Sequence, residues 1–229
     1  MINNRTNNDL EGILIVNKPS GITSHDVVQK IRKKFGMKRV GHAGTLDPLA
    51  TGVLVVLLGK STKLFDQFVT FDKAYRATLI LGLKTSSADI QGKVLAENSY
   101  HNISEHQIRE SFQKFIGEIY QIPPMVSAIK HKGKKLYQLA RAGIEVEREP
   151  RKVTISQLKL EKIILPHVTF DVDCSKGTYI RTLAEDIGND LGCGACISQI
   201  ERTKVGKFRL DEAVKIEDID ESHIRHWKN

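Results

Sequence analysis

The sequence predicts an α+β protein built around a central mixed or mostly antiparallel sheet flanked by helices. Short runs of consecutive or alternating apolar residues indicate strands, and segments with apolar residues three and four apart indicate helices. The two kinds of element interleave without the regular alternation of a parallel α/β protein. Among the 229 residues, 40% are hydrophobic and 27% are charged, which excludes collagen-like, wholly disordered and disulfide-scaffold chains.

The first predicted elements are a buried strand and an amphipathic helix. Residues 12–16 form a continuous apolar run, and Pro19-Ser20-Gly21 then turns the chain. Ser24 is the expected N-cap of the helix, and Gly36 its stop. The apolar face of this helix is expected to consist of Val27, Val28, Ile31 and Phe35.

The remaining elements follow from the same patterns. A glycine-rich loop over residues 41–52 precedes a strand over 53–58, and residues 75–83 alternate as a strand. Ser104 is expected to cap a helix with Ile108, Phe112 and Phe115 facing inward. The later elements are expected to be a surface insertion over about 122–152 with a short helix at 136–142, a strand at 168–174, a helix at 180–191 ended by Gly192, and a last strand region at 197–208.

The charge balance indicates a polyanionic partner. Thirty-five Lys and Arg against 27 Asp and Glu give a net charge of +8, and nucleic acid is the first candidate, with simple solubility as the alternative. The excess is concentrated in two places. The first cluster is Lys30, Arg32, Lys33, Lys34, Lys38 and Arg39, and the second is Lys130, Lys132, Lys134 and Lys135, extended by Arg141, Arg151 and Lys152.

Several function classes lack their sequence signals. The Cys193–Cys196 pair has no second pair to complete a zinc site, the histidines are scattered, and no metal site is expected. No apolar run approaches the roughly 18 residues of a membrane span, and the N-terminus has no signal-peptide pattern. A cytoplasmic protein with reduced cysteines is therefore expected.

The loop over residues 41–52 is the strongest candidate for chemistry. Its glycines permit close backbone approach, and its one carboxylate, Asp47, lies between Leu46 and Pro48 at the foot of a buried strand. Such a loop can hold a single carboxylate at a fixed point. The alternative is an ordinary Asp-Pro turn. The loop matches neither a phosphate-binding loop nor a dinucleotide fingerprint.

This loop, Gly41-His42-Ala43-Gly44-Thr45-Leu46-Asp47-Pro48-Leu49-Ala50-Thr51-Gly52, resembles the catalytic motif of the TruB family of tRNA pseudouridine synthases. Four other segments resemble family motifs in the family's order. They are residues 17–26, Tyr75 at the start of a strand, residues 123–130, and residues 176–188. The resemblance extends from about residue 17 to residue 200, and it implies the pseudouridine synthase fold.

The resemblance implies an isomerase that needs no cofactor. It converts a T-loop uridine of tRNA by detaching the uracil at nitrogen, turning it and rejoining it through carbon. Asp47 is then the catalytic carboxylate, Tyr75 and Tyr179 are the aromatic candidates for the uracil pocket, and Arg181 pairs with Asp47 and keeps it ionised. The remaining substrate contacts implied are His42 and Ile200. Without the resemblance, each tyrosine could be a core residue and Arg181 an exposed helix charge.

The resemblance also gives the basic residues a role in contacting the RNA backbone of the T-arm. The residues implied are Lys18, Lys130, Lys132, Lys134, Lys135, Arg141, Arg151 and Lys152. The expected layout is a flexible N-terminus over residues 1–9, a catalytic domain over 10–210, and a short tail over 211–229 without a complete PUA domain. A monomer without metal or membrane contact is expected. The competing functions are a non-catalytic tRNA-binding or RNA-chaperone protein and a nucleoside hydrolase.

Overall fold

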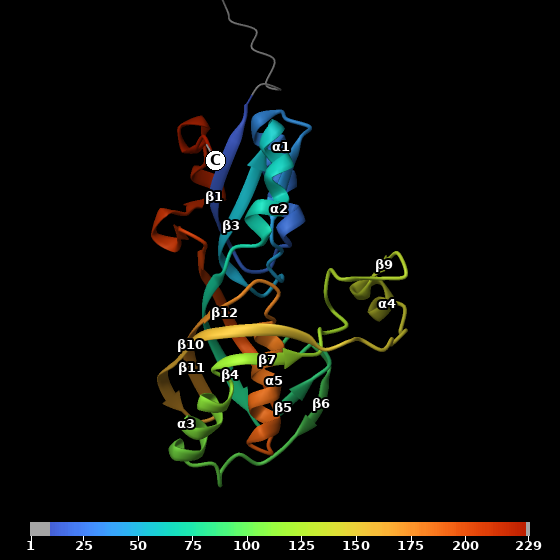
Figure 1. The fold of residues 1–229 in the computed structure, drawn as a ribbon, viewed down its shortest axis with the longest axis vertical. Coiled ribbons are helices and arrows are strands. Elements are labelled where there is room, and N and C mark those ends of the chain that lie inside the picture. Colours follow the sequence, from blue (N-terminus) through green and yellow to red (C-terminus); the bar gives the residue numbers. More distant parts are fainter. Residues whose placement is uncertain (1–9, 228–229) are drawn as a thin grey trace, which may run out of the picture. The chain divides into compact units, whose positions relative to one another are not determined.

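The structure is a computed structural model that describes residues 10–227, so the expected flexible segment 1–9 lies outside the described residues. The chain forms two compact units (Figure 1). One comprises Met1–Ala74 and Glu201–Asn229, and the other comprises Tyr75–Ile200. We refer to them as the first and the second unit.

The first unit contains a sheet with the strand order β14-β1-β3-β12, in which β2 also pairs with β3 and β13 with β12. Its β1–β3 and β2–β3 pairs are antiparallel, and its β1–β14 and β12–β3 pairs are parallel. The elements are β1 (Gly12–Lys18), α1 (Ser24–Phe35), β2 (Val40–Ala43), β3 (Thr51–Leu58), η2 (Gly59–Leu64), α2 (Phe65–Val69), the end of β12 (Ala195–Val205), β13 (Phe208–Arg209), η3 (Leu210–Glu212), β14 (Val214–Lys215), η4 (Ile216–Asp218) and η5 (Glu221–His223).

Helix α1 begins one residue earlier than the sequence predicts. Its N-cap is Thr23, whose hydroxyl accepts a hydrogen bond from the backbone N–H of Asp26 at 3.0 Å, while Asp26 accepts from the Thr23 N–H at 2.8 Å. This reciprocal pair is a capping box. Ser24, expected as the cap, is instead a buried first residue of the helix. The helix ends at Gly36, which has a φ of 62° as a C-cap glycine requires.

The residues after 210 belong to the core of the first unit. Strand β14 pairs with β1, and the ring of Trp227 lies 4.8 Å from that of Phe68 between centroids. Phe68, Val205 and Phe208 are buried in the same apolar cluster. The structure therefore does not separate residues 211–227 as a tail, because their apolar side chains complete this cluster.

The second unit contains the rest of the same strand order, β12-β4-β11-β10-β7, with two small two-stranded sheets beside it. Where the sequence predicts one catalytic domain over 10–210, residues 75–200 thus form a unit of their own. The elements are β4 (Lys73–Leu81), β5 (Leu83–Thr85), β6 (Val94–Glu97), α3 (Glu105–Lys114), β7 (Gly117–Gln121), β8 (Lys130–His131), β9 (Lys134–Lys135), α4 (Leu136–Arg141), β10 (Arg151–Ile164), β11 (His167–Cys174) and α5 (Ile180–Asp190).

In the second unit, helix α3 packs against β10 and against α5 (Figure 1). Ser104 caps α3 as predicted, and Phe112 contacts Phe170 of β11 edge-on at 5.3 Å between ring centroids. The β10–β11 and β10–β7 pairs are antiparallel. The prediction of an α+β fold with a mixed, mostly antiparallel sheet is confirmed.

Candidate active site

Asp47 lies in the loop that joins β2 to β3 in the first unit, and its side chain is half-buried. Its carbonyl accepts a hydrogen bond from the N–H of Ala50 at 3.1 Å, which closes a turn over residues 47–50. The turn interpretation of Asp-Pro is therefore correct for the backbone. It does not conflict with a chemical role, because a turn with a fixed backbone also fixes the root of its side chain.

The residues from the turn after β1 to the start of α1 bond the loop on both sides of Asp47. The Ser24 hydroxyl accepts from the Leu46 N–H at 2.8 Å and donates to the Leu46 carbonyl at 3.1 Å. The Gly21 N–H donates to the Pro48 carbonyl at 2.9 Å. The Ser20 hydroxyl donates to the Leu49 carbonyl at 3.1 Å. Two of the motif-like segments in the sequence, 17–26 and 41–52, are thus parts of one hydrogen-bonded assembly.

Lys18 belongs to this assembly, and its prediction as an RNA backbone contact is wrong. The residue is fully buried, and its ammonium donates to the carbonyls of Pro19 (2.8 Å), Ile22 (2.7 Å) and Pro48 (3.4 Å). A phosphate could not reach it. Burial lowers the pKa of Lys18 to about 8, while the nearby carboxylate of Asp47 acts in the opposite direction.

His42 is the other predicted site residue of the first unit. It lies on β2, directly opposite Val56 of β3, and it is half-buried. The hairpin of β2 and β3 thus carries His42 and Asp47 at positions five residues apart.

Four predicted site residues belong to the second unit: Tyr75, Tyr179, Arg181 and Ile200. Tyr75 and Ile200 lie on β4 and β12, and both are half-buried. Tyr179 precedes α5, and both its backbone groups bond the side-chain amide of Gln121, at 3.0 and 3.2 Å. The pairing of Asp47 with Arg181 stays a prediction.

Arg181 is buried, which excludes its interpretation as an exposed helix charge. The residue is 3% exposed, and its guanidinium donates to the carbonyls of Ser87 and Val126, each at 2.8 Å. Its Nε lies 3.9 Å from Oδ2 of Asp89, which is also buried. Asp89 accepts at Oδ1 from the Ser87 hydroxyl at 2.6 Å.

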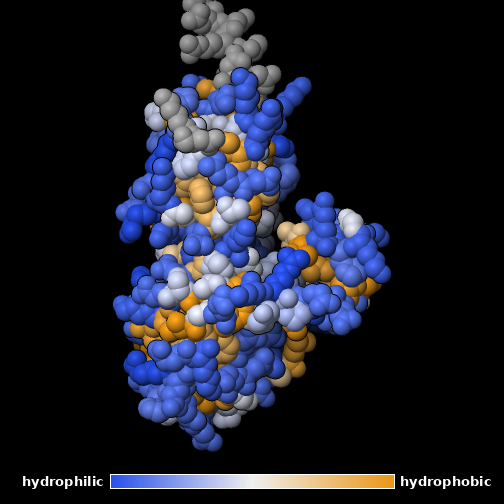
Figure 2. Space-filling model, viewed as in Figure 1, coloured by the Kyte–Doolittle hydropathy of each residue, from blue (hydrophilic) through white to orange (hydrophobic). Residues whose placement is uncertain are grey.

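The basic residues predicted to contact RNA, Lys18 excepted, are all exposed. Lys130 and Lys135 pair in the β8–β9 hairpin, and α4 follows it directly. Lys135 and Arg141 both lie over the ring of Tyr137, at 5.6 and 5.5 Å from its centroid. Figure 2 shows this segment as a mainly hydrophilic surface. The exposed residues are Lys130, Lys132, Lys134, Lys135, Arg141, Arg151 and Lys152.

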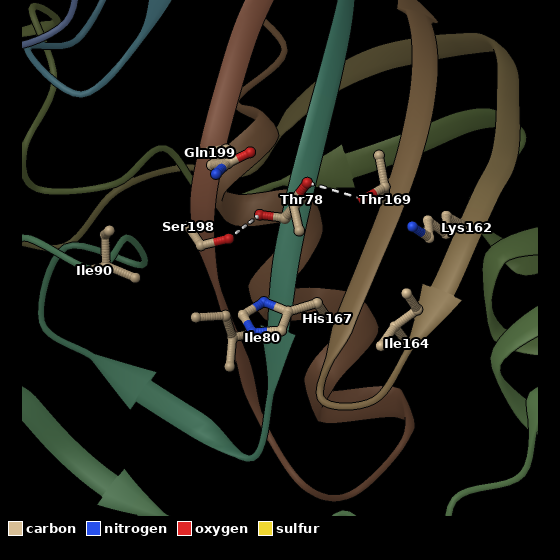
Figure 3. A pocket seen from close by; sticks show the side chains of 9 residues that line it. All are labelled: Thr78, Ile80, Ile90, Lys162, Ile164, His167, Thr169, Ser198 and Gln199. Atoms are coloured by element: carbon tan, nitrogen blue, oxygen red, sulfur yellow. Dashed lines mark hydrogen bonds between the residues drawn. The ribbon is translucent and has the colours of Figure 1, made fainter.

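A cavity of about 580 Å³ lies over the sheet of the second unit (Figure 3). Thr78 links its walls, because its carbonyl accepts from the Ser198 hydroxyl and its own hydroxyl bonds that of Thr169, both at 3.0 Å. The lining residues include none of the predicted site residues. They are Thr78, Ile80, Ile90, Lys162, Ile164, His167, Thr169, Ser198 and Gln199.

Within residues 10–227 the structure has no group of three or more His, Cys, Asp or Glu side chains placed to hold a metal ion. The three cysteines, Cys174, Cys193 and Cys196, are buried. None of the helices among these residues is long and apolar enough to cross a membrane.

Comparison with known proteins assigns the family. Residues 32–180 match the model of the TruB family pseudouridylate synthase N-terminal domain, and residues 181–229 match that of the tRNA pseudouridylate synthase B C-terminal domain. The chain belongs to the TruB family of pseudouridine synthases. The loop of Asp47 lies within the residues that match the TruB N-terminal model.

Relatives in the TruB family align over nearly the whole chain. The tRNA pseudouridine synthase B of Clostridium tetani is 52% identical over 218 residues, which cover 95% of this chain and 75% of that protein. The enzyme of the same name from Endomicrobium trichonymphae is 49% identical over 93% of each chain. In a crystal structure of a Cbf5-Nop10-Gar1 complex, one chain is 31% identical with a TM-score of 0.72. That match covers 90% of this chain but only 53% of the other.

Sequence reasoning missed two buried charged residues, one in each unit, that contact predicted site residues or their loop. Asp89 lies beside Arg181, and Arg202, which is 1% exposed, lies beside the loop of Asp47. Both are charged residues that the sequence would place at a surface. The two glycines Gly44 and Gly52 were the available signal, because glycine is needed where another segment approaches the backbone closely. In the structure the segment that approaches both glycines is Arg202.

Proposed function

We propose that this protein converts a uridine in the T-loop of tRNA to pseudouridine, with Asp47 as the catalytic carboxylate. Support comes from TruB family membership and from relatives named tRNA pseudouridine synthase B. The observation that carries the proposal is the support of Asp47: a half-buried carboxylate whose neighbours Leu46 and Pro48 are both hydrogen-bonded by the 18–24 segment. A carboxylate held in this way is oriented before the substrate arrives.

The reaction is balanced without any co-reactant. The bond between N1 of uracil and C1′ of ribose breaks, the detached uracil turns, and a bond between C5 and C1′ forms. C5 then loses its proton and N1 gains one, so substrate and product have the same mass. A carboxylate suits such a reaction because it is ionised near pH 7 and can act at an anomeric carbon or accept a proton.

The other predicted residues take roles around this carboxylate. A uridine within a folded loop must leave the base stack to be reached, and Tyr75 and Tyr179 are proposed to stack on it. His42 and Ile200 are proposed to contact the everted nucleotide. Arg181 is proposed to pair with Asp47, and its burial, which fixes the guanidinium between the carbonyls of Ser87 and Val126, favours such a fixed role.

The substrate contact is proposed to involve the 122–152 segment. Its seven exposed basic side chains are suited to the phosphates of the T-arm, which supply affinity, while loop bases supply identity. We further propose that the protein acts as a monomer in the cytoplasm, where tRNA is modified.

The test compares the wild type with Asp47→Asn, which keeps the size of the side chain but removes its charge. Both proteins are incubated with unmodified tRNA, and pseudouridine is detected by chemical labelling because its mass equals that of uridine. We expect product with the wild type and none with Asp47→Asn, while tRNA binding and circular dichroism stay unchanged. Pseudouridine formation by Asp47→Asn would refute the role of Asp47.

The same incubation separates the competing functions. A nucleoside hydrolase would release free uracil, which chromatography detects, whereas the isomerase keeps the base attached. A non-catalytic RNA-binding protein would bind tRNA and leave both uracil and pseudouridine undetected.

A further inference from the structure

Arg202 on β12 is the buried cation most closely joined to the Asp47 loop. Its Nε donates to the Val53 carbonyl at 2.7 Å, its Nη1 to the Thr45 carbonyl at 3.4 Å, and its Nη2 to the Gly44 carbonyl at 3.2 Å. Gly44 and Thr45 precede Asp47, whereas Val53 follows the loop. One planar guanidinium therefore connects the entry and the exit of the loop, and its donors leave the group in fixed directions.

The backbone of Arg202 is also in close contact with the end of this loop, at Gly52. Arg202 faces Gly52 in the parallel β12–β3 pair, and Gly52 has a φ of +97°. A β-carbon on Gly52 would overlap the Arg202 carbonyl and lie 2.9 Å from the Arg202 nitrogen. Backbone packing on one side and three side-chain hydrogen bonds on the other leave the loop little room to shift relative to β12.

The free-energy cost of burying the charge of Arg202 also indicates a functional role, because an apolar residue would serve stability as well. The guanidinium of Arg202 donates to three backbone carbonyls, those of Gly44, Thr45 and Val53. A buried cation is costly, and a well-packed apolar side chain is often as stable at such a site. The charge of Arg202 also acts on buried Lys18, whose ammonium is attracted by the Asp47 carboxylate. Two buried cations thus contact the backbone around the loop, whose single carboxylate is Asp47.

We propose that Arg202 is a positioning residue for the reaction: by clamping the carbonyls of Gly44, Thr45 and Val53, it fixes where the Asp47 carboxylate is presented to the substrate. Arg202 does not touch the substrate in this proposal. The inference rests on the proposed function, because it assumes that Asp47 is the reacting group.

The test uses Arg202→Lys, which keeps the charge, and Arg202→Met, which keeps only the length. Single-turnover rates are measured at saturating tRNA, alongside the tRNA dissociation constant and the folded fraction by circular dichroism. We expect the rate per folded molecule to fall about 100-fold in both variants, with tRNA affinity within about twofold of the wild type, because a small displacement of a reacting group has this effect. The loop amides should also exchange hydrogen faster.

Val205→Ala serves as the matched control. Val205 is fully buried on the same strand, belongs to the apolar cluster of Phe68 and Phe208, and is not one of the residues that Arg202 binds. This variant should lose stability while its rate per folded molecule stays unchanged. Sucrose, which favours the folded state, is added to all samples so that destabilised variants remain folded.

The outcomes separate the two proposals. A wild type that forms no pseudouridine, or an active Asp47→Asn, refutes the proposed function itself. An active wild type with inactive Asp47→Asn, but with Arg202→Lys and Arg202→Met at wild-type rates, overturns the positioning role alone. The positioning role is also overturned if neither variant folds in sucrose, since Arg202 is then a folding element.

Discussion

The hydroxyl of Ser24 forms both of its hydrogen bonds with Leu46, the residue that immediately precedes Asp47. It accepts from the Leu46 N–H at 2.8 Å and donates to the Leu46 carbonyl at 3.1 Å. Ser24 is the first residue of α1 and is 1% exposed, so this pair joins the start of a helix to the loop in a buried position. These two bonds to the helix restrict the movement of the backbone next to Asp47.

Ser24→Ala should weaken both stability and catalysis. The substitution leaves the buried N–H and carbonyl of Leu46 without this partner, which costs about 1–3 kcal/mol of unfolding free energy. The single-turnover rate should fall with it, because Asp47 loses one of its anchors. Urea unfolding and pseudouridine formation measure the two effects.

Thr23→Ala is the matched control for Ser24→Ala. It removes the capping hydroxyl of α1 one residue earlier and costs about 1 kcal/mol of stability. Since Thr23 is exposed and its hydroxyl bonds only Asp26 in the capping box, the rate per folded molecule should not change. Equal rate losses in the two variants would show that helix stability, not the Leu46 pair, matters.

Gly52→Ala should be severely destabilising. The residue has a positive φ, and its new β-carbon would overlap the backbone of Arg202, so strain and overlap together should cost about 3 kcal/mol or more. Gly21→Ala separates the two causes, because Gly21 has a φ of +85° with nothing within 4 Å of the added carbon. That variant should lose only about 1–2 kcal/mol. Thermal and urea unfolding compare them, and equal losses would contradict the close approach at Gly52.

The sequence predicts the fold class and most helices because those depend on local periodicity. The buried runs of β1 and β3 and the capped helices α1 and α3 are examples. Strand β10 was not predicted, because its burial alternates irregularly along 14 residues and its pairing with β11 contains two register shifts. Such a strand is defined by its neighbours rather than by its own pattern.

In the candidate site, too, local sequence patterns predict some features, whereas features that depend on tertiary contacts are missed. Asp47 and its loop could be found from residue types and motif order. The burial of Lys18, Asp89 and Arg202 could not, because each side chain also contacts a segment distant in the sequence. These contacts are to Pro48, Arg181 and Gly44, respectively. From their charges alone, these residues are expected at the surface. They can be buried because the folded chain provides hydrogen-bond partners for their charged groups.

Lys18→Met should change how stability depends on pH. The pKa of Lys18 is lowered from 10.5 to about 8 by burial, so between these values the unfolded chain binds more protons than the folded one. The stability contribution of Lys18 therefore rises with pH from about 8 to 10.5, with a slope of at most about 1.4 kcal/mol per pH unit. Urea unfolding at several pH values should show that slope reduced in Lys18→Met.

The control for Lys18→Met is Lys60→Met, which removes an exposed lysine of the same unit. This substitution should leave the slope between pH 8 and 10.5 as it is in the wild type. A slope that is unchanged in Lys18→Met, or equally reduced in both variants, would contradict a buried ammonium at Lys18.

Charge removal from the β8–β9 hairpin should weaken tRNA binding and make it less dependent on salt. A fourfold alanine variant at Lys130, Lys132, Lys134 and Lys135 is combined with Asp47→Asn, so that binding is measured without turnover. Each lost phosphate contact lowers the slope of log affinity against log salt by about 0.7–0.9 units. Four lost contacts therefore reduce it by about 3, which titrations at several salt concentrations resolve.

The comparison variant removes the same charge from another exposed surface, Lys30, Lys33, Lys34 and Lys38 at the end of α1. If the hairpin makes the phosphate contacts, this variant should keep most of the salt slope and lose little affinity, because a change in net charge alone acts weakly beyond the Debye length of about 8 Å. Equal losses in the two variants would mean that affinity follows net charge, and the assignment of the T-arm contact to the 122–152 segment would then be wrong.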